Sequence, residues 1–155
     1  MSLLSIIIGL AILFNGLLAG ITIDTSLVKL PARRRIGNIA YAVFARGNDL
    51  GNGIIVYSTL AIGAALFVFT ATLIGFLQKI KGDVMLPLVI ASVTTIIHFT
   101  GTAMAVPVML SIKNTPDDEA ILKKKIDEFE KWNDFRACFQ FITFLLLLYG
   151  FATSR

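Results

Sequence analysis

Charged residues are scarce in this chain, and their scarcity excludes a water-soluble domain. Only 15% of its 155 residues are charged and 56% are hydrophobic, whereas roughly a quarter of the residues in a soluble domain are charged. The mean hydropathy is +0.81. A soluble domain must expose polar groups to water over most of its surface, and this chain has too few of them. The excess apolar surface therefore has to face lipid. The sequence therefore predicts an integral membrane protein.

Cysteine and histidine are represented by one residue each, Cys138 and His98. A single cysteine has no intramolecular partner, which excludes a disulfide-stapled scaffold. One histidine and one cysteine, with no carboxylate inside any apolar run, cannot supply the ligand set of a zinc or non-haem iron site. A haem held by one axial histidine remains as an option that no residue pattern supports. We expect no cofactor and no metal.

Long uncharged runs occur in four places, over residues 3–23, 53–77, 84–112 and 137–154. A hydrocarbon core of ~30 Å needs about 20 helical residues, which each run nearly or fully supplies. The runs are apolar on every side, which favours helices over the alternating strands of a membrane barrel. The first run lacks a preceding basic region and is too long for a signal peptide, so we expect a retained helix.

We therefore predict an all-α fold: one integral membrane domain, 1–155, built as an antiparallel four-helix bundle. Pro107 should kink or end the third helix. The fourth helix should start in the cytoplasm near Pro116, with Thr115 as its cap, and should continue unbroken into the membrane. Pairs of small residues spaced by four, such as Gly16 with Gly20, predict close helix packing.

Basic residues are concentrated in two connections. The connection after the first run holds five and the connection after the third run holds six of the fourteen lysines and arginines. The positive-inside rule places both connections in the cytoplasm and both termini outside the cell membrane. The cluster from Arg33 to Arg35 lies close to a predicted span, so its expected partner is membrane lipid and not nucleic acid.

His98 lies in the middle of the third run, with Thr102 on the same helical face. It could lock two helices together through a threonine hydroxyl or a backbone carbonyl. It could instead be a buried proton acceptor, or orient a ligand, because burial favours the neutral imidazole. An unpartnered imidazole in hydrocarbon costs several kcal/mol, so His98 should line a cavity that Asn15 borders and that opens toward Tyr57.

A polar mouth is expected at the cytoplasmic side, where the apolar stripe of the fourth helix turns polar at Asn133 and Arg136. Trp132 belongs to the same mouth, and the residues of the first connection that should face the pair are Arg46, Asp49 and Asn52. An intrahelical pair between Arg46 and Asp49 is one arrangement that their spacing allows. His98 is ~20 Å from either end of its helix, so we expect His98 and Arg136 to be too far apart for one small substrate.

The four predicted spans, Pro107 after the third, and the motif W-N-x-x-R at Trp132, Asn133 and Arg136 resemble the anthrone-oxygenase-like family of small membrane proteins. The likeness covers most of the chain. It implies a cofactor-independent oxidation of a polycyclic phenol by dioxygen. By the resemblance, His98 would be the base, and Asn133 and Arg136 would stabilise the anion. The chain departs from the family after Pro107, where it has valine and methionine and the family often has leucine and asparagine.

Two functions of different classes follow. The first is an enzyme acting on an apolar aromatic or quinone-like molecule that arrives from lipid. Its substrate-binding residues would be Asn15, Tyr57, Thr102, Asn133 and Arg136. The second is a non-catalytic accessory subunit whose small-residue faces bind another membrane protein or further copies of the chain.

Overall fold

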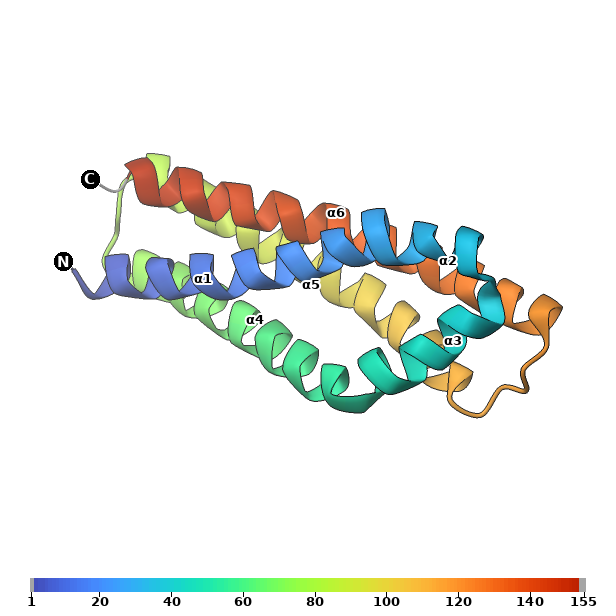
Figure 1. Cartoon of the computed structure of the whole chain (residues 1–155). Helices are drawn as coiled ribbons and strands as arrows, with labels where there is room; N and C mark the ends of the chain where they lie inside the picture. Colours follow the sequence, from blue (N-terminus) through green and yellow to red (C-terminus); the bar gives the residue numbers. More distant parts are fainter. Residues whose placement is uncertain (1, 154–155) are drawn as a thin grey trace.

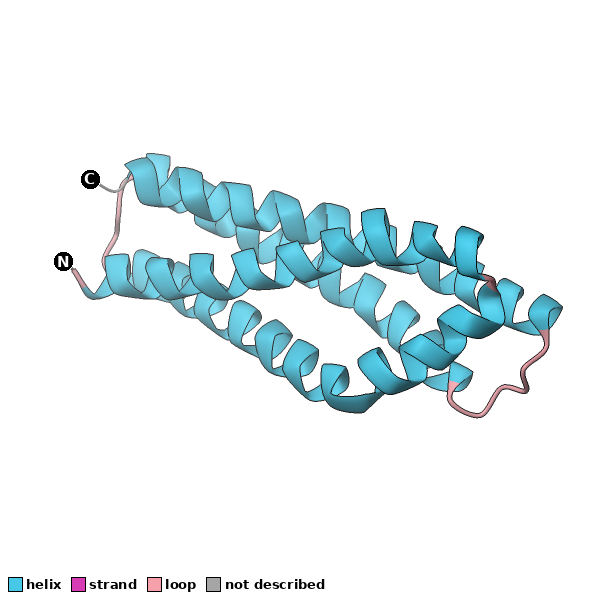
Figure 2. Cartoon of the chain, viewed as in Figure 1, coloured by secondary structure: helices cyan, strands magenta, loops and turns pink. Residues whose placement is uncertain are grey.

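The computed structural model describes residues 2–153, which form eight helical elements and no strand (Figure 1, Figure 2). The long elements are α1 (Leu3–Asp24), α4 (Ile54–Leu77), α5 (Gly82–Ile112) and α6 (Glu119–Thr153). Four helices of the described chain are long and apolar enough to cross a membrane. The all-α prediction is confirmed. The last residue of the fourth predicted run, Ser154, lies outside the described residues.

The four long helices lie side by side. α1 contacts α4 and α6, and α5 contacts the same two helices. Both ends of the chain lie at one end of the molecule, next to the short link between α4 and α5 (Figure 1). We call this the terminal end; its core is apolar and includes Ile8, Val68, Leu88 and Leu147. Each of the four long helices contributes one of these side chains, so the terminal end is packed from all sides.

The connection between α1 and α4 is helical and not an irregular loop. It contains a π-helical turn η1 (Thr25–Lys29), α2 (Leu30–Ile36), α3 (Asn38–Gly47) and a second turn η2 (Asn48–Gly53). Gly37, between α2 and α3, has a φ of 88°, a conformation that glycine adopts without steric cost. The chain reverses there, so that α3 leads back toward α4 (Figure 1).

α6 starts later than the sequence predicts. The predicted cap, Thr115, lies in the connection after α5 and donates its hydroxyl to the carbonyl of Ser111, in the last turn of α5, at 2.8 Å. Asp118 is the residue that caps α6, because its Oδ1 accepts a hydrogen bond from the amide of Ile121 at 2.8 Å. A carboxylate at this position also complements the positive end of the helix dipole. From there α6 continues without a break to Thr153.

α5 does not end at Pro107, so of the two outcomes expected at this proline, a kink or the end of the helix, the second is wrong. The helix continues to Ile112. Arg46 of α3 satisfies carbonyl groups at this end: its Nε donates to the carbonyl of Ile112 at 3.2 Å and its Nη2 to that of Thr115 at 2.6 Å. Its Nη1 pairs with Asp117 at 2.7 Å. The residue is thus a cap for α5 and not a partner of Asp49.

Candidate functional site

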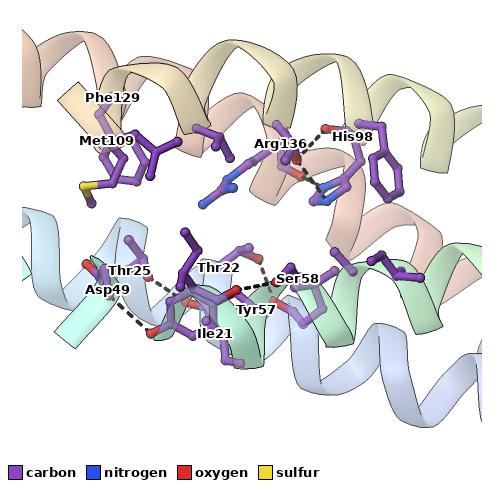
Figure 3. Close-up of a pocket in the computed structure, with 18 of the residues that line it drawn as sticks. Ile21, Thr22, Thr25, Asp49, Tyr57, Ser58, His98, Met109, Phe129 and Arg136 are labelled. Carbon is purple, nitrogen blue, oxygen red and sulfur yellow. Dashed lines mark hydrogen bonds between the residues drawn. The ribbon is translucent and has the colours of Figure 1, made fainter. Parts of the chain in front are cut away.

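A cavity of about 250 Å³ lies between the long helices. Figure 3 shows that α5 and α6 form one wall, with His98 and Arg136, and that α1, η2 and α4 form the other, with Asp49 and Tyr57. Most of the lining is apolar, and it includes Leu18, Ile21, Leu50, Ile54, Ala61, Ile62, Phe99, Val106, Met109, Leu110 and Phe129. An apolar lining with a few polar groups is typical of a small-molecule site.

The cavity reaches the surface between α4 and α5. On the α4 side its lining residue Ile62 is 64% exposed, and on the α5 side Leu110 is 42% and Val106 38% exposed. The hydrogen bonds that join these two helices lie near the terminal end, where Thr72 donates to the carbonyl of Leu88 at 3.1 Å and contacts the hydroxyl of Ser92. The cavity therefore opens where α4 and α5 are not joined by these bonds.

One ring nitrogen of His98 is a hydrogen-bond acceptor. Its Nδ1 lies 3.1 Å from the carbonyl oxygen of Arg136, and a carbonyl only accepts, so Nδ1 carries the hydrogen in the neutral imidazole. Nε2 is then an acceptor. Thr102 Oγ1 lies 3.3 Å from Nε2 and 3.0 Å from the carbonyl of His98, and its one hydrogen serves one of them at a time. The ring thus contacts α6 through Nδ1 and retains basic capacity at Nε2.

His98 and Arg136 lie together in this cavity, which corrects the expectation that they are too far apart for one substrate. α5 and α6 approach closely at Gly101, where an added Cβ would lie 2.9 Å from Phe135 Cδ1 and 3.1 Å from Arg136 Cβ. Beyond Gly101, α5 packs against the first turns of α6 through an apolar cluster that includes Met109. The middle of α5 is therefore level with the start of the apolar run of α6.

Arg136 presents a positive charge to the cavity. Its Nε and Nη2 donate to Asn133 Oδ1 at 3.0 and 2.8 Å, and Asn133 Nδ2 donates to Ser26 Oγ at 2.8 Å. The guanidinium carbon also lies 5.8 Å from the centre of the Phe129 ring, within the range of a cation–π contact. Within residues 2–153 we find no hydrogen-bond partner for Nη1, which can therefore donate to a ligand.

Asp49 presents a carboxylate from the opposite wall. Its Oδ1 accepts hydrogen bonds from Asn48 Nδ2 at 2.9 Å and from the Tyr57 hydroxyl at 3.2 Å. Its Oδ2 is buried and has no hydrogen-bond partner among the described residues. Lys29 and Arg136 interact with the carboxylate electrostatically. The cavity is therefore polarised, with a cation on one wall and an anion on the other.

Asn15 does not border this cavity, which corrects its predicted place beside His98. Its Nδ2 donates to the carbonyl of Ala11 at 2.8 Å and to that of Ala64 at 3.4 Å. Its Oδ1 accepts from Gln140 Nε2 at 2.8 Å. Asn15 thus joins α1, α4 and α6 as a buried structural contact.

The predicted polar mouth is only partly assembled. Asn133 is buried and orients Arg136, while Asp49 and Tyr57 line the cavity. The predicted mouth residues that do not line it are Arg46, Asn52, Trp132 and Asn133, so Asn133 is not among the lining residues that could contact a substrate directly. Thr22, Thr25 and Ser58 line it without having been predicted. Thr22 lies two helical turns after Asn15 on the same face of α1. This spacing is the sequence pattern from which Thr22 could have been predicted.

The arrangement can accept a proton at His98 Nε2 and stabilise an anion at Arg136. In the part of the chain that the structure describes, no group of histidine, cysteine and acidic side chains could hold a metal ion. No protein-family model, no curated protein and no solved structure matches this chain. The chemistry of the cavity is therefore the basis on which a function can be inferred.

Proposed function

We propose that this chain is a multi-pass protein of the cell membrane, an antiparallel bundle of four spans with both termini outside, and that its cavity takes up an apolar aromatic or quinone-like molecule from lipid. The observation that carries this proposal is the apolar opening between α4 and α5 at Ile62, Val106 and Leu110. A ligand dissolved in hydrocarbon passes through such an opening without crossing water. Polar groups inside then fix its orientation.

We further propose that the bound molecule is oxidised by dioxygen without a cofactor, as the resemblance to the anthrone-oxygenase-like family implies. His98 Nε2 takes a proton from an activated methylene group, and Arg136 stabilises the resulting enolate. Dioxygen converts the methylene to a carbonyl. One oxygen atom stays in the product, and the other leaves as water with both methylene hydrogens. The adjacency of His98 and Arg136 in one cavity supports this assignment.

Oxidation of anthrone by the purified protein in lipid nanodiscs tests the chemistry. The wild type should consume oxygen and form anthraquinone faster than protein-free nanodiscs. His98→Gln should stay folded and lose turnover by about 100-fold or more, since general-base catalysis contributes ~10²–10⁴. Thr100→Ala, at an exposed position on the same helix, is the matched control and should keep the wild-type rate. If His98→Gln keeps full turnover while His98→Phe destabilises the protein, His98 only locks helices and the oxygenase proposal fails.

Accessibility of single cysteines tests the topology. In a Cys138→Ala background, Ser2→Cys and Lys124→Cys introduce thiols at exposed positions on opposite predicted sides of the membrane. An impermeant thiol reagent added to intact cells should label position 2 and leave position 124 unlabelled until the cells are lysed. Labelling of both positions in intact cells would contradict the four-span topology.

A further inference from the structure

The carboxylate of Asp49 has an acceptor that the protein itself does not use. The side chain lines the cavity, and the residue is only 8% exposed. Asn48 and Tyr57 both donate to Oδ1, so they hold the carboxylate in one orientation. Oδ2 is buried and has no hydrogen-bond partner among the described residues. Buried polar atoms are nearly always paired, so an unpaired and oriented acceptor points to a group that arrives with a ligand.

We infer that Asp49 Oδ2 accepts a hydrogen bond from a hydroxyl group of the bound molecule and so selects ligands that carry a donor. This inference rests on the proposed function, because it assigns a specificity residue in the same cavity. His98 and Arg136 lie on the opposite wall (Figure 3). The ligand therefore offers its hydroxyl to Asp49 and an acceptor or anionic oxygen to Arg136.

The charges in the cavity favour a neutral hydroxyl over a cationic amine. The Asp49 carboxylate would attract an ammonium group, but the Arg136 guanidinium faces the same enclosed space and would repel that group. The volume of about 250 Å³ lies below the ~300–1,000 Å³ of sites for drug-sized ligands. We therefore expect a compact, neutral, hydroxylated aromatic molecule.

The pair of probes 1-naphthol and 1-methoxynaphthalene tests the inference, because they share one ring system and differ in the donor hydrogen. Binding is measured by calorimetry on the full chain in nanodiscs, with protein-free nanodiscs as the blank. The wild type should bind 1-naphthol about tenfold more tightly than 1-methoxynaphthalene, the factor expected for a hydrogen bond to a charged acceptor. A ratio near one in the wild type would overturn the inference without any variant.

Asp49→Asn sharpens the test. Its amide oxygen should occupy the Oδ1 position, because Asn48 and Tyr57 both donate there. The amide nitrogen then replaces Oδ2, so a donor stands where an acceptor was. The preference for 1-naphthol should fall to about one or reverse. Asp49→Leu is the second variant, and it should remove the preference while leaving 1-methoxynaphthalene binding intact.

Thr100→Ala, at an exposed position of α5 that does not line the cavity, is the matched control and should keep the preference for 1-naphthol. If the preference survives in both Asp49 variants, or is lost in Thr100→Ala as well, the inference is overturned while the proposed function stands, because the cavity still binds the probes. If neither probe binds the wild type above the blank, the proposed function fails and the inference fails with it.

Discussion

The two ends of the molecule both have an apolar core, but only the end opposite the termini adds a cluster of ion pairs. The terminal end is held by close apolar packing of the four long helices, as at Ile8 and Leu88. At the opposite end an ion-pair cluster fixes the short helices to the start of α6, and Arg33 contacts both Asp127 and Glu130 there. The cavity lies between the two. The cavity therefore separates two apolar cores, and the core at the charged end is covered by ion pairs.

The difference predicts different responses to change. Packing at the terminal end and along α5 and α6 should be sensitive to side-chain volume. The charged end should be sensitive to pH and to the loss of single charges, because its contacts are carboxylates with arginine or with backbone amides. Substitutions that act on only one kind of contact can therefore separate the two regions.

The largest effect is expected from Arg33→Ala at the charged end. The Arg33 side chain is 7% exposed and pairs with two carboxylates, so its removal leaves Glu130 partly buried without its main partner. Removing one member of a buried ion pair costs ~3–5 kcal/mol, and the half-exposed Asp127 places this case near the lower limit. The free energy of unfolding in detergent should fall by about 3 kcal/mol. Arg34→Ala is the control: its side chain is 72% exposed, and a change above ~0.5 kcal/mol would contradict the account.

Gly101→Ala should have the next largest effect, at the contact that brings α6 against α5. The added Cβ would press on Phe135 and on the Arg136 Cβ, and the helix backbone limits how far Arg136 can move. Overpacking of this kind costs ~1–3 kcal/mol, and separation of the helices should weaken the contact between His98 and Arg136. Thermal unfolding measures the first effect and 1-naphthol binding the second. Gly20→Ala, which has open space around the new Cβ, should be neutral or stabilising and should leave binding unchanged.

Glu119 should make the charged end acid-sensitive. Hydrogen bonds from the backbone and side chain of Asn38 and the backbone of Ile39 lower the pKa of Glu119 from its ordinary value of 4.5. Because the pKa of Glu119 is lower in the folded chain than in the unfolded chain, its ionised carboxylate stabilises the fold above pH 4.5. This stabilisation is lost as the pH falls through the pKa of the folded state. Glu119→Gln should therefore lower Tm at neutral pH, and the difference from wild type should shrink below about pH 4. A difference that stays constant down to pH 3 would argue against this role.

The smallest effect is expected in the link at the terminal end. Lys79 adopts a φ of 50° and its amide donates to the carbonyl of Phe76, while Ile80 donates to Gly75. This is the helix ending in which glycine is usual. Lys79→Gly should raise the free energy of unfolding by less than about 1 kcal/mol, since relief of strain is offset by greater freedom of the unfolded chain. A loss of stability would mean that the lysine side chain contributes a contact of its own.

The four long helices could be predicted from the sequence because each contains a long uncharged run, and such a run favours a helix that is long and apolar enough to cross a membrane. The short helices between α1 and α4 were missed, since their charges end the apolar run although the backbone stays helical. Thr115 and Asp118 are both acceptable caps by residue type. Asp118 serves as the cap because the hydroxyl of Thr115 is bonded back to the last turn of α5, which ends at Ile112.

The site could be predicted by residue type but not by arrangement. His98, Arg136, Asp49 and Tyr57 stand out as polar residues near apolar runs, and all four line the cavity. The distances between these side chains depend on how far α5 and α6 are shifted relative to each other along their axes. The length of a single apolar run does not determine this shift. Asn15 shows the same limit, since its partner Gln140 lies on another helix and could be assigned only from the packing.

The most direct test of the account is to locate an aromatic ligand in a crystal structure. Crystals grown with 4-bromo-1-naphthol, with anomalous scattering recorded at the bromine edge, would give its position independently of the surrounding density. The account predicts a bromine peak inside the cavity that opens between α4 and α5, with the ligand hydroxyl within hydrogen-bond distance of Asp49. A peak confined to the outer apolar surface of the helices, with the cavity empty, would contradict it.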